Sequence, residues 1–566
     1  MKQLLFVFLL NSLSFFVQAQ EVKESKTVML STYFTPEKKF LVLPIKNGAP
    51  KRNAELWVDG VNVRYFDLEL PEGHPDWYAY LNISEWKGKP VELRVDKVTL
   101  GSNVFSPILQ SDSDTNSGTL YREKLRGQFH FSPKRGWTND PNGMVYYNGE
   151  YHLFFQHNPY GREWGNMTWG HAVSADLVHW KELDDAFHPD QSGPMFSGSA
   201  VVDEKNTGGF GKPGKPAMVM FYTGAKAWSQ YLAWSTDGRT FQKLDHAVVP
   251  RINKDNRDPK VIWHEPTKKW VMAVYVERDN MQHSMQFLTS PDLKNWTKAS
   301  VIKGGIDNDR YLFECPEFYE LPVEGSPNEK KWILTGANSE YAIGSFDGKT
   351  FVPEIEKLNG QRGRDFYAAQ TFNNEPNGRR IEIGWRRTYT NKEGMTFNQS
   401  QSIPMEQKLV HARDGIRLTR MPVKELEGLR AKAYKLGSLT LKENGINPLK
   451  DISIELVEMR MEIEPGHAKD IVLNVRGVPV TYNVAKQELM VDGITAPAPL
   501  QNGKLSLIVY ADRTGIEIFV NNGLLYMPIN INLNQDNKSL SLSTKGGVVK
   551  VSNLDAYELK SIWEDN

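Results

Sequence analysis

The chain has 566 residues, a length typical of two to four domains, and 40% of them are hydrophobic. Its 68 basic and 68 acidic residues cancel, which argues against nucleic acid or an anionic membrane surface as a partner. The one cysteine, Cys315, excludes a disulfide framework and a multi-cysteine metal site. We expect it to be a buried, unreactive thiol, since no Cys/His/Asn pattern accompanies it.

The first 19 residues predict a cleaved secretory signal. Lys2 precedes an apolar run at residues 4–10, and residues 17–19 (VQA) form a small-x-small cleavage site. A membrane anchor is the alternative, but polar residues interrupt the run at positions 11, 12 and 14. No cysteine follows to carry a lipid, and no later stretch is apolar enough to span a bilayer. We therefore expect an exported protein, periplasmic or extracellular, without a membrane span.

Residues 26–118 predict a small N-terminal β-sandwich. Short runs rich in β-branched and aromatic residues alternate with turn signals at Asn47-Gly48 and Asp59-Gly60. No cluster of acids or ligands stands out, so an accessory role is expected, with carbohydrate binding as an alternative. Residues 110–117 are polar and rich in Ser and Asp, which is typical of a linker.

A repeat of the form S-x-D-[LG]-x-x-[WF] begins four times, at spacings of 61, 55 and 55 residues. Such a period, with only short strands between turns, is typical of β-propeller blades. In each copy the aspartate would accept backbone N–H groups in a tight turn, and the aromatic residue would cover the outer strand. The four copies lie at residues 174–180 (SADLVHW), 235–241 (STDGRTF), 290–296 (SPDLKNW) and 345–351 (SFDGKTF).

A fifth blade without the repeat fits between Asp365 and about residue 410, with residues 380–385 (RIEIGW) as one strand. We therefore predict an all-β protein with a five-bladed propeller over residues 126–415. Residues 416–435 carry no strong pattern and predict a linker. Residues 430–566 return to alternating strands, with a hairpin turn at 521–523 (NNG), and predict a second, C-terminal β-sandwich.

Three acids occupy nearly the same place in their blades. Asp140, Asp258 and Glu314 precede their repeat motifs by 34, 32 and 31 residues. Ser197 precedes its motif by 38 residues, and Asp365 opens the fifth blade. Since the first strand of each blade lines the propeller axis, equivalent positions should converge on one funnel. Taken alone, each acid could be a turn or surface residue. Surface acids, however, have no reason to occupy the same position in three different blades.

Converging carboxylates suit glycoside hydrolysis. One must be ionised to attack the sugar or activate water, and another must hold a proton for the leaving oxygen. A third can bind hydroxyl groups and stabilise developing positive charge. Tryptophans 137, 164 and 385 could offer flat faces to a sugar ring, although each could equally belong to a core.

At these residues the chain resembles glycoside hydrolase family 32, the β-fructosidases that cleave sucrose, levan and inulin. The resemblance covers about residues 126–566 and leaves out the N-terminal sandwich. Thr138 departs from the family, which usually has a larger apolar residue there. The matching stretches, in order, are 137–143 (WTNDPNG), 154–159 (FFQHNP), 164–171 (WGNMTWGH), 196–199 (FSGS), 257–259 (RDP), 314–316 (ECP) and 509–523 (VYADRTGIEIFVNNG).

The resemblance implies a role for each matching residue. Asp140 would be the nucleophile and Glu314 the acid and base, while Asp258 would hold fructose hydroxyls and stabilise the transition state. The reaction would retain configuration, with the first two carboxyl groups about 5–5.5 Å apart. Residues implied to bind substrate are Trp137, Asn139, Gln156, Trp164, Phe196, Ser197, Arg257 and Trp385.

Several alternatives stay open at this point. An arabinan-type hydrolase also uses three acids on a five-bladed propeller, but the sequences flanking Asp140 and Glu314 argue against it. A non-catalytic sugar-binding protein, a fructosyltransferase and an endo-acting levanase are the others, and we favour exo action on levan, inulin or sucrose. No metal or organic cofactor is expected, because the chain carries no metalloprotease helix motif, P-loop or dinucleotide fingerprint.

Overall fold

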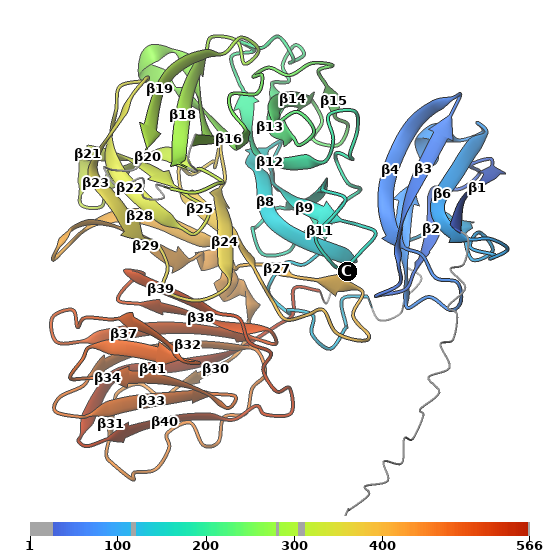
Figure 1. The fold of residues 1–566 in the computed structure, drawn as a ribbon. Coiled ribbons are helices and arrows are strands. Elements are labelled where there is room, and N and C mark those ends of the chain that lie inside the picture. Colours follow the sequence, from blue (N-terminus) through green and yellow to red (C-terminus); the bar gives the residue numbers. More distant parts are fainter. Residues whose placement is uncertain (1–26, 115–119, 279–281, 304–311, 564–566) are drawn as a thin grey trace, which may run out of the picture.

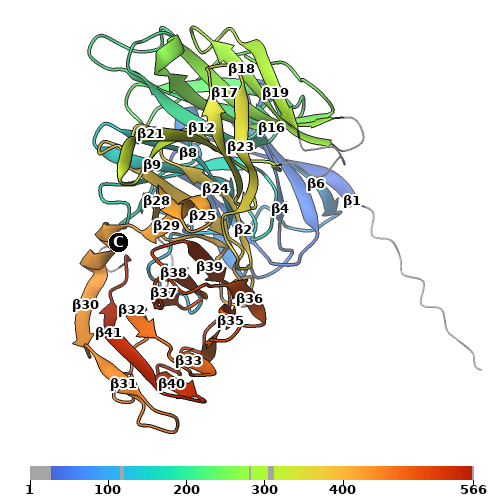
Figure 2. The same ribbon diagram turned by 90° about the vertical axis from the view of Figure 1, so that its left-hand side faces the viewer.

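The computed structural model describes residues 27–114, 120–278, 282–303 and 312–563. The predicted signal at residues 1–19 lies outside these ranges. Figures 1 and 2 show three bodies of β-structure: a propeller, an N-terminal sandwich beside it and a C-terminal sandwich against another side of it. The predicted fold class is therefore confirmed.

The N-terminal sandwich has a four-stranded and a three-stranded sheet around a shared apolar core. Gln110 and Ser111, predicted to begin a linker, instead form an edge strand that pairs with β2. The first sheet has the order β1 (Thr27–Phe34), β6 (Val91–Thr99), β3 (Lys51–Val58) and β4 (Val61–Glu69). The second has the order β5 (Trp77–Asn82), β2 (Phe40–Ile45) and β7 (Leu109–Ser111).

Five antiparallel blades form the propeller, and each starts with the strand nearest the axis. Blade one is β8 (Gly136–Tyr147), β9 (Glu150–Asn158), β10 (Thr168–Ser174) and β11 (Lys181–Glu182). Blade two is β12 (Met195–Asp203), β13 (Ala217–Gly224), β14 (Ser229–Ser235) and β15 (Gln242–Lys243). Blade three is β16 (Asp255–His264), β17 (Lys269–Arg278), β18 (Gln282–Ser290) and β19 (Thr297–Lys303).

Blade four is β20 (Phe318–Val323), β21 (Ser326–Thr335), β22 (Glu340–Phe346) and β23 (Phe351–Asn359). Blade five is β24 (Phe366–Thr371), β25 (Arg380–Arg386), β28 (Met405–Ala412) and β29 (Gly415–Pro422), with β27 (Ser400–Gln401) on β25. A single parallel pair, Val323 with Leu409, joins these two blades. The short strand β26 (Phe397–Asn398), which follows β25 of blade five, pairs with the start of β8. The last blade is thereby joined to the first by backbone pairing.

The repeat occupies the turn between the third and fourth strands of its blade, as predicted. In every copy the aspartate Oδ1 accepts two successive backbone N–H groups, at 2.7–3.0 Å. The aromatic residue then starts or precedes the outer strand, and Trp180 and Phe351 are buried there. These local bonds explain why the motif recurs with the blade.

Residues 416–435 are not a linker, so that prediction was wrong. Strand β29 extends the fifth blade to Pro422, the 3-10 helix η4 (Lys424–Leu429) follows, and β30 (Arg430–Lys435) already belongs to the C-terminal sandwich. The sequence misled because its charged residues alternate with apolar ones only weakly. The paired backbone, rather than the side chains, makes these segments regular.

The C-terminal sandwich consists of two antiparallel sheets. One has the order β30, β41 (Val549–Leu559), β32 (Val457–Glu464), β37 (Leu505–Asp512), β38 (Gly515–Val520) and β39 (Leu525–Ile529), with β31 (Leu439–Leu441) on β41. The other has the order β36 (Ile494–Pro497), β35 (Glu488–Val491), β34 (Val478–Asn483), β33 (Asp470–Val475) and β40 (Leu540–Lys545). The predicted turn at 521–523 joins β38 to β39, with all three residues at positive φ.

A buried polar contact fixes this sandwich to the propeller. His130 Nδ1 lies 2.7 Å from Asp512 Oδ2, and its Nε2 lies 2.6 Å from Glu517 Oε2. Asp512 also accepts the backbone N–H groups of Gln128 and Phe129. Burial raises the pKa of Asp512, but the bond with His130 outweighs it and leaves that pKa at about 2. The segment that leads into the first blade is thereby bound to strands β37 and β38.

Candidate active site

Four of the five inner strands carry an irregularity at the same level. The register shifts between Thr138 and Pro141 in β8, and between Phe196 and Gly198 in β12. It shifts again between Arg257 and Lys260 in β16, and within residues 367–370 of β24. A β-bulge bends its strand and redirects a side chain. Asp140, Ser197 and Asp258 all lie in these bulges.

Asp140 is held in place by its two neighbours in the bulges. Ser197 Oγ donates a hydrogen bond to Asp140 Oδ2 at 2.6 Å, and Asn139 Nδ2 donates to its Oδ1 at 3.0 Å. Trp137 Nε1 in turn donates to Asn139 Oδ1 at 2.9 Å. Both carboxylate oxygens therefore have a donor, and the side chain remains partly exposed.

Asp258 and Cys315 lie beneath Asp140. Asp258 Oδ2 accepts the backbone N–H of Cys315 at 3.0 Å, and Thr223 Oγ1 accepts the N–H of Asp258 at 3.0 Å. The thiol Sγ is 3.6 Å from Asp140 Oδ2 and 3.5 Å from Asp258 Oδ2. Asp258, Glu314 and Cys315 have positive φ values, a rare conformation that holds side chains in fixed directions.

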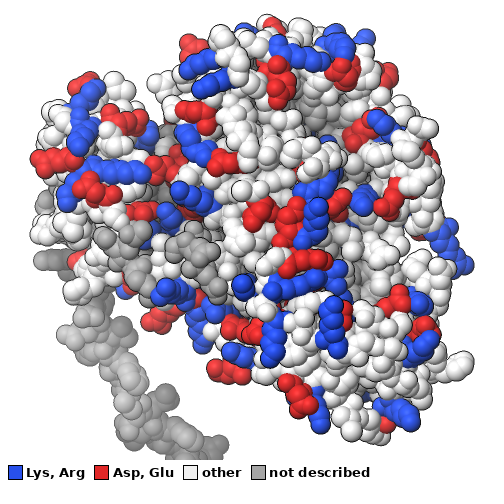
Figure 3. Space-filling view, turned by 180° about the vertical axis from the view of Figure 1, so that it is seen from behind, with Lys and Arg blue, Asp and Glu red and all other residues white. Residues whose placement is uncertain are grey.

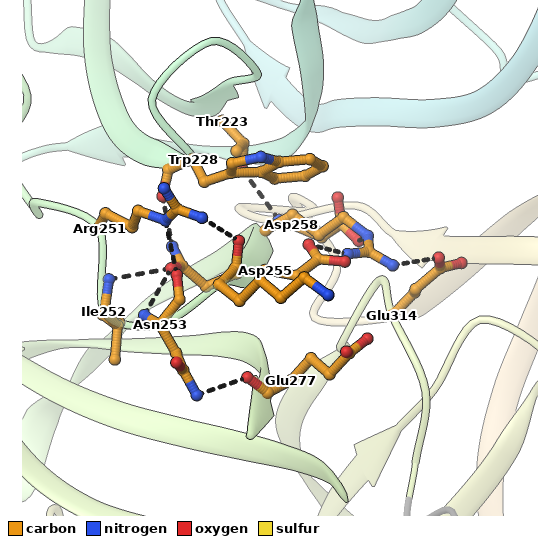
Figure 4. Close-up of polar contacts among 12 residues, drawn as sticks. Thr223, Trp228, Arg251, Ile252, Asn253, Asp255, Asp258, Glu277 and Glu314 are labelled. Atoms are coloured by element: carbon orange, nitrogen blue, oxygen red, sulfur yellow. Dashed lines mark hydrogen bonds and ion pairs between the residues drawn. The ribbon is translucent and has the colours of Figure 1, made fainter. Parts of the chain in front are cut away.

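Arg257 connects the second and third acids. Its Nη2 donates to Glu314 Oε1 at 2.5 Å, its Nε lies 3.8 Å from Asp258 Oδ2, and its Nη1 contacts Asp255. Figure 4 shows these carboxylates around the guanidinium, with the Trp228 ring beside them. The other oxygen of Glu314 accepts a hydrogen bond from Tyr367 Oη at 2.7 Å.

The three predicted acids therefore meet at one cluster that holds a single guanidinium. Burial raises the pKa of Asp258 to about 7, against the lowering effect of Arg257, and the other two acids add to the rise. Burial likewise raises the pKa of Asp140, while its hydrogen bonds from Ser197 and Asn139 lower it. Like charges at this range disfavour ionisation of all three acids together.

The thiol differs from the acids. Burial raises the pKa of Cys315 well above its usual range, and the neighbouring acids raise it further. It is therefore protonated at neutral pH and donates its S–H to one of the two adjacent carboxylates at a time. Its predicted burial is confirmed, with 2% exposure, but no sequence pattern predicted this contact with two acids.

Two groups of aromatic rings lie near the acids. In the first, Trp385 meets Trp137 edge to face at 5.8 Å between centroids and Tyr367 at 6.2 Å. In the second, Phe196 meets Trp164 at 6.0 Å and Trp228 at 5.6 Å. Trp164 is 53% exposed, an unusual value for so large a ring. These rings offer apolar faces of the kind that stack on sugars.

Gln156 lies behind the cluster rather than in its opening. The side chain is 1% exposed, and its Nε2 donates to Met195 O at 2.9 Å. With its amide turned to satisfy its neighbours, Asn142 accepts from Gln156 Nε2 at 3.0 Å and donates to Ser197 Oγ at 3.2 Å. Gln401 Nε2 donates to Asn139 O at 2.7 Å. The bulge that carries Asp140 is thus supported from beneath by amides.

Sequence reasoning missed Tyr367, Thr223, Trp228 and Asp255, all of which contact the acids or Arg257. Tyr367 could have been found, because it lies two residues after Asp365 at the start of the fifth blade. Within the described residues, no group of three or more His, Cys, Asp or Glu side chains is arranged to hold a metal ion. Nor does any helix there have the length and apolarity to cross a membrane.

Known proteins that resemble this chain agree on one family. The glycosyl hydrolases family 32 N-terminal domain matches residues 130–422, and the family's C-terminal domain matches residues 425–558. The levanase of Bacillus subtilis is 38% identical over 497 residues, which cover 80% of this chain and 73% of the relative. The extracellular exo-inulinase of Aspergillus awamori is 30% identical over 521 residues, which cover 78% and 96%.

Solved structures give the same result. The crystal structure of exo-inulinase from Aspergillus awamori matches with a TM-score of 0.69 and 28% identity, and covers 78% of this chain and 100% of that chain. Fructan 1-exohydrolase IIa from Cichorium intybus shares the fold at a TM-score of 0.65. Both domain matches begin after the N-terminal sandwich. From residue 130 onwards the chain belongs to glycosyl hydrolase family 32.

Proposed function

We propose that this protein is a retaining glycosidase that hydrolyses β-D-fructofuranosyl linkages in fructans. The observation that carries the proposal is the meeting of Asp140, Asp258 and Glu314 around one guanidinium, within a family of glycosyl hydrolases. Relatives named levanase and exo-inulinase support levan and inulin as the substrate class. Sucrose carries the same fructosyl group and is a second expected substrate.

In the first half of the reaction, Asp140 attacks the anomeric carbon C2 of the terminal fructosyl unit. The bond between C2 and the glycosidic oxygen breaks, and Glu314 gives its proton to that oxygen. This assignment requires one carboxyl group to be protonated while another is ionised. Retention requires these two groups to be about 5–5.5 Å apart in the complex.

In the second half, water attacks C2 of the fructosyl ester and passes a proton to Glu314. The ester oxygen of Asp140 leaves as a carboxylate, so the site returns to its starting protonation state. Tyr367 Oη and Arg257 Nη2 each hold one oxygen of Glu314, which fixes its orientation through both halves. Asp258 would accept hydroxyl groups of the fructose ring and stabilise positive charge that develops on it.

Exo action with release of fructose is the favoured mode. This mode is supported by a relative named exo-inulinase, whose solved structure shares the fold. An endo-acting levanase and a fructosyltransferase would use the same acids. The predicted export also remains a proposal, supported by relatives whose names describe extracellular enzymes.

A time course of products from levan, inulin, sucrose and arabinan tests the proposal. Fructose from the first time points supports exo hydrolysis, a ladder of oligosaccharides means endo attack, and longer products at high sucrose mean transfer. Asp140→Ala and Glu314→Ala should each lower the rate by several orders of magnitude with little change in melting temperature. Release of arabinose alone, or no reaction at all, would refute the assignment.

A further inference from the structure

The outer face of the four-stranded N-terminal sheet borders a groove on its side towards the propeller. The groove has a volume of about 630 Å³, and its walls are β3, β4 and β6 on one side and the segment after β9 on the other. Strand β4 is the one nearest the propeller in Figure 1. Cavities of roughly 300–1,000 Å³ are the size that holds small organic ligands.

Polar and aromatic side chains on this face are fixed relative to one another. Glu55 is paired across the sheet with Arg94 on one side and Tyr65 on the other. The Arg94 guanidinium lies over the Trp57 ring at 4.2 Å and bonds to Glu92 at 2.9 Å, and Trp57 Nε1 donates to Glu55 at 2.7 Å. Such a preorganised set of planar groups loses little freedom when it binds a ligand.

Trp164 links the groove to the aromatic residues beside the candidate active site. It lines the groove and also meets Phe196 edge to face. Phe196 precedes Ser197, whose hydroxyl is bonded to Asp140. A chain of sugars that leaves the acids past Phe196 would therefore reach the exposed Trp164 ring and then the sheet.

Direct bonds hold the two walls of the groove together. Asn166 donates to Asp67 O at 2.8 Å and accepts the Asp67 N–H at 2.8 Å, as adjacent strands would. Tyr65 Oη donates to Asp190 O at 3.3 Å. The sheet is thus positioned against the loop that carries Trp164, and the groove is part of the folded structure.

The charges of the lining residues limit the class of ligand that the groove can bind. Glu55, Asp67 and Asp96 face the groove with Arg94 as the one cationic lining residue, so an anionic polymer would be repelled. Figure 3 shows acidic and basic side chains interspersed on the face it presents, including the N-terminal sandwich, without a field of one sign. Exposed rings beside carboxylate, amide and guanidinium groups suit a neutral sugar chain.

We propose that this groove binds fructosyl units of a polymeric substrate beyond those held at the acids. The proposal rests on the proposed function and gives the N-terminal sandwich a part in substrate recognition. It predicts a preference for long fructans over sucrose, which carries a single fructosyl unit. Binding by the groove adds to the affinity for polymer and leaves the chemical step unchanged.

The test compares the full chain with its Tyr65→Ala variant on sucrose and on whichever of levan or inulin is the better substrate. Loss of one aromatic contact should lower kcat/KM on the polymer by about 2- to 10-fold, mainly through KM, and leave sucrose unchanged. Tyr78→Ala is the matched control: Tyr78 is 39% exposed against 37% for Tyr65, but lies on the other sheet. This variant should change kcat/KM on neither substrate.

Two further variants separate sugar contact from domain placement. Tyr65→Phe removes the bond to Asp190 but keeps the ring, so it should retain polymer activity; a loss equal to that of Tyr65→Ala would overturn the proposal. Tyr65→Leu keeps an apolar side chain and replaces Tyr65→Ala if the latter does not fold. An equal loss on both substrates, or none on the polymer, would also overturn it.

A binding measurement keeps this inference distinct from the proposed function. Affinity electrophoresis of the Asp140→Asn protein in gels that contain levan or inulin needs no catalysis. Retardation that Tyr65→Ala weakens and Tyr78→Ala does not would support the groove. Retardation unaffected by Tyr65→Ala would refute it, even if the wild-type protein releases fructose as proposed.

Discussion

Removal of the Arg257 charge should shift the pH dependence of activity towards alkaline pH. The guanidinium is 13% exposed and lies 3.8 Å from Asp258 Oδ2, with Glu314 bonded to its Nη2. Two unit charges about 4 Å apart interact by about 4 kcal/mol at an effective dielectric constant near 20. At about 1.4 kcal/mol per pKa unit, Arg257→Met could raise the pKa of Asp258 by up to about three units.

The direction of this pH shift follows from the protonation state that Asp258 needs for activity. In its proposed role Asp258 has to be ionised to stabilise positive charge, so a higher pKa moves the acidic limb of the kcat/KM profile to higher pH. We expect Arg257→Met to move that limb by about 1–3 pH units and to lower kcat/KM at neutral pH by about 10²–10³-fold. Arg257→Lys keeps the charge but loses the forked contact, and should shift the limb by less than about one unit.

The assay is sucrose hydrolysis between about pH 4 and pH 9, with melting temperature measured alongside. Arg239→Met is a suitable control, because Arg239 forms an exposed pair with Glu150 at 2.6 Å. Exposed pairs contribute roughly 0–1 kcal/mol, so this variant should retain the wild-type profile. An unshifted acidic limb in a folded Arg257→Met protein would show that Arg257 does not control the charge of the acids.

Four further predictions concern other groups of the site and of the contact between the propeller and the C-terminal sandwich. Cys315→Ala removes the S–H donor between two acids and should lower kcat by about 3- to 10-fold. The wild-type thiol should resist iodoacetamide at neutral pH, and rapid alkylation of the folded protein would contradict its burial. Tyr367→Phe removes a donor to Glu314 and should lower kcat while KM changes little; an effect confined to KM would mean that the hydroxyl only binds substrate. His130→Ala removes the partner that Asp512 and Glu517 share and should lower the free energy of unfolding in urea by about 3–5 kcal/mol. A loss under about 1 kcal/mol would refute the buried contact. Because the pKa of Asp512 is lowered to about 2 from 3.8, its contribution to stability is full above about pH 4 and should vanish as pH falls through about 2, as acid titration of unfolding would show.

The propeller could be predicted because its turns are local. Each repeat aspartate bonds to backbone groups two and three residues away, so the signal lies within seven residues of sequence. The blade period then placed the three acids at equivalent positions in their blades, and the propeller fold brings such positions together at its axis. The strands of blade five carry no such turn, but the alternation of charged and apolar residues at 380–385 sufficed to locate β25.

Other features could not be predicted, because they depend on contacts between distant segments. The bulge at Asp258 exists through pairing with β17, and Tyr367 reaches Glu314 from the next blade. The strand after Gly415 is regular because of its partner β28, although its own sequence predicted a linker. The groove of the N-terminal sandwich needs residues about 100 positions apart, such as Asp67 and Asn166, to be placed together.

The pairing of β26 with β8 makes the strand that carries Asp140, the proposed nucleophile, dependent on the fifth blade. Phe397 and Asn398 bond to Gly136 and Trp137, only three residues before Asp140, across some 260 positions of sequence. A nascent chain that has emerged only through its fourth blade lacks this pairing. The backbone contacts beside Asp140 are therefore complete only once the fifth blade has been synthesised.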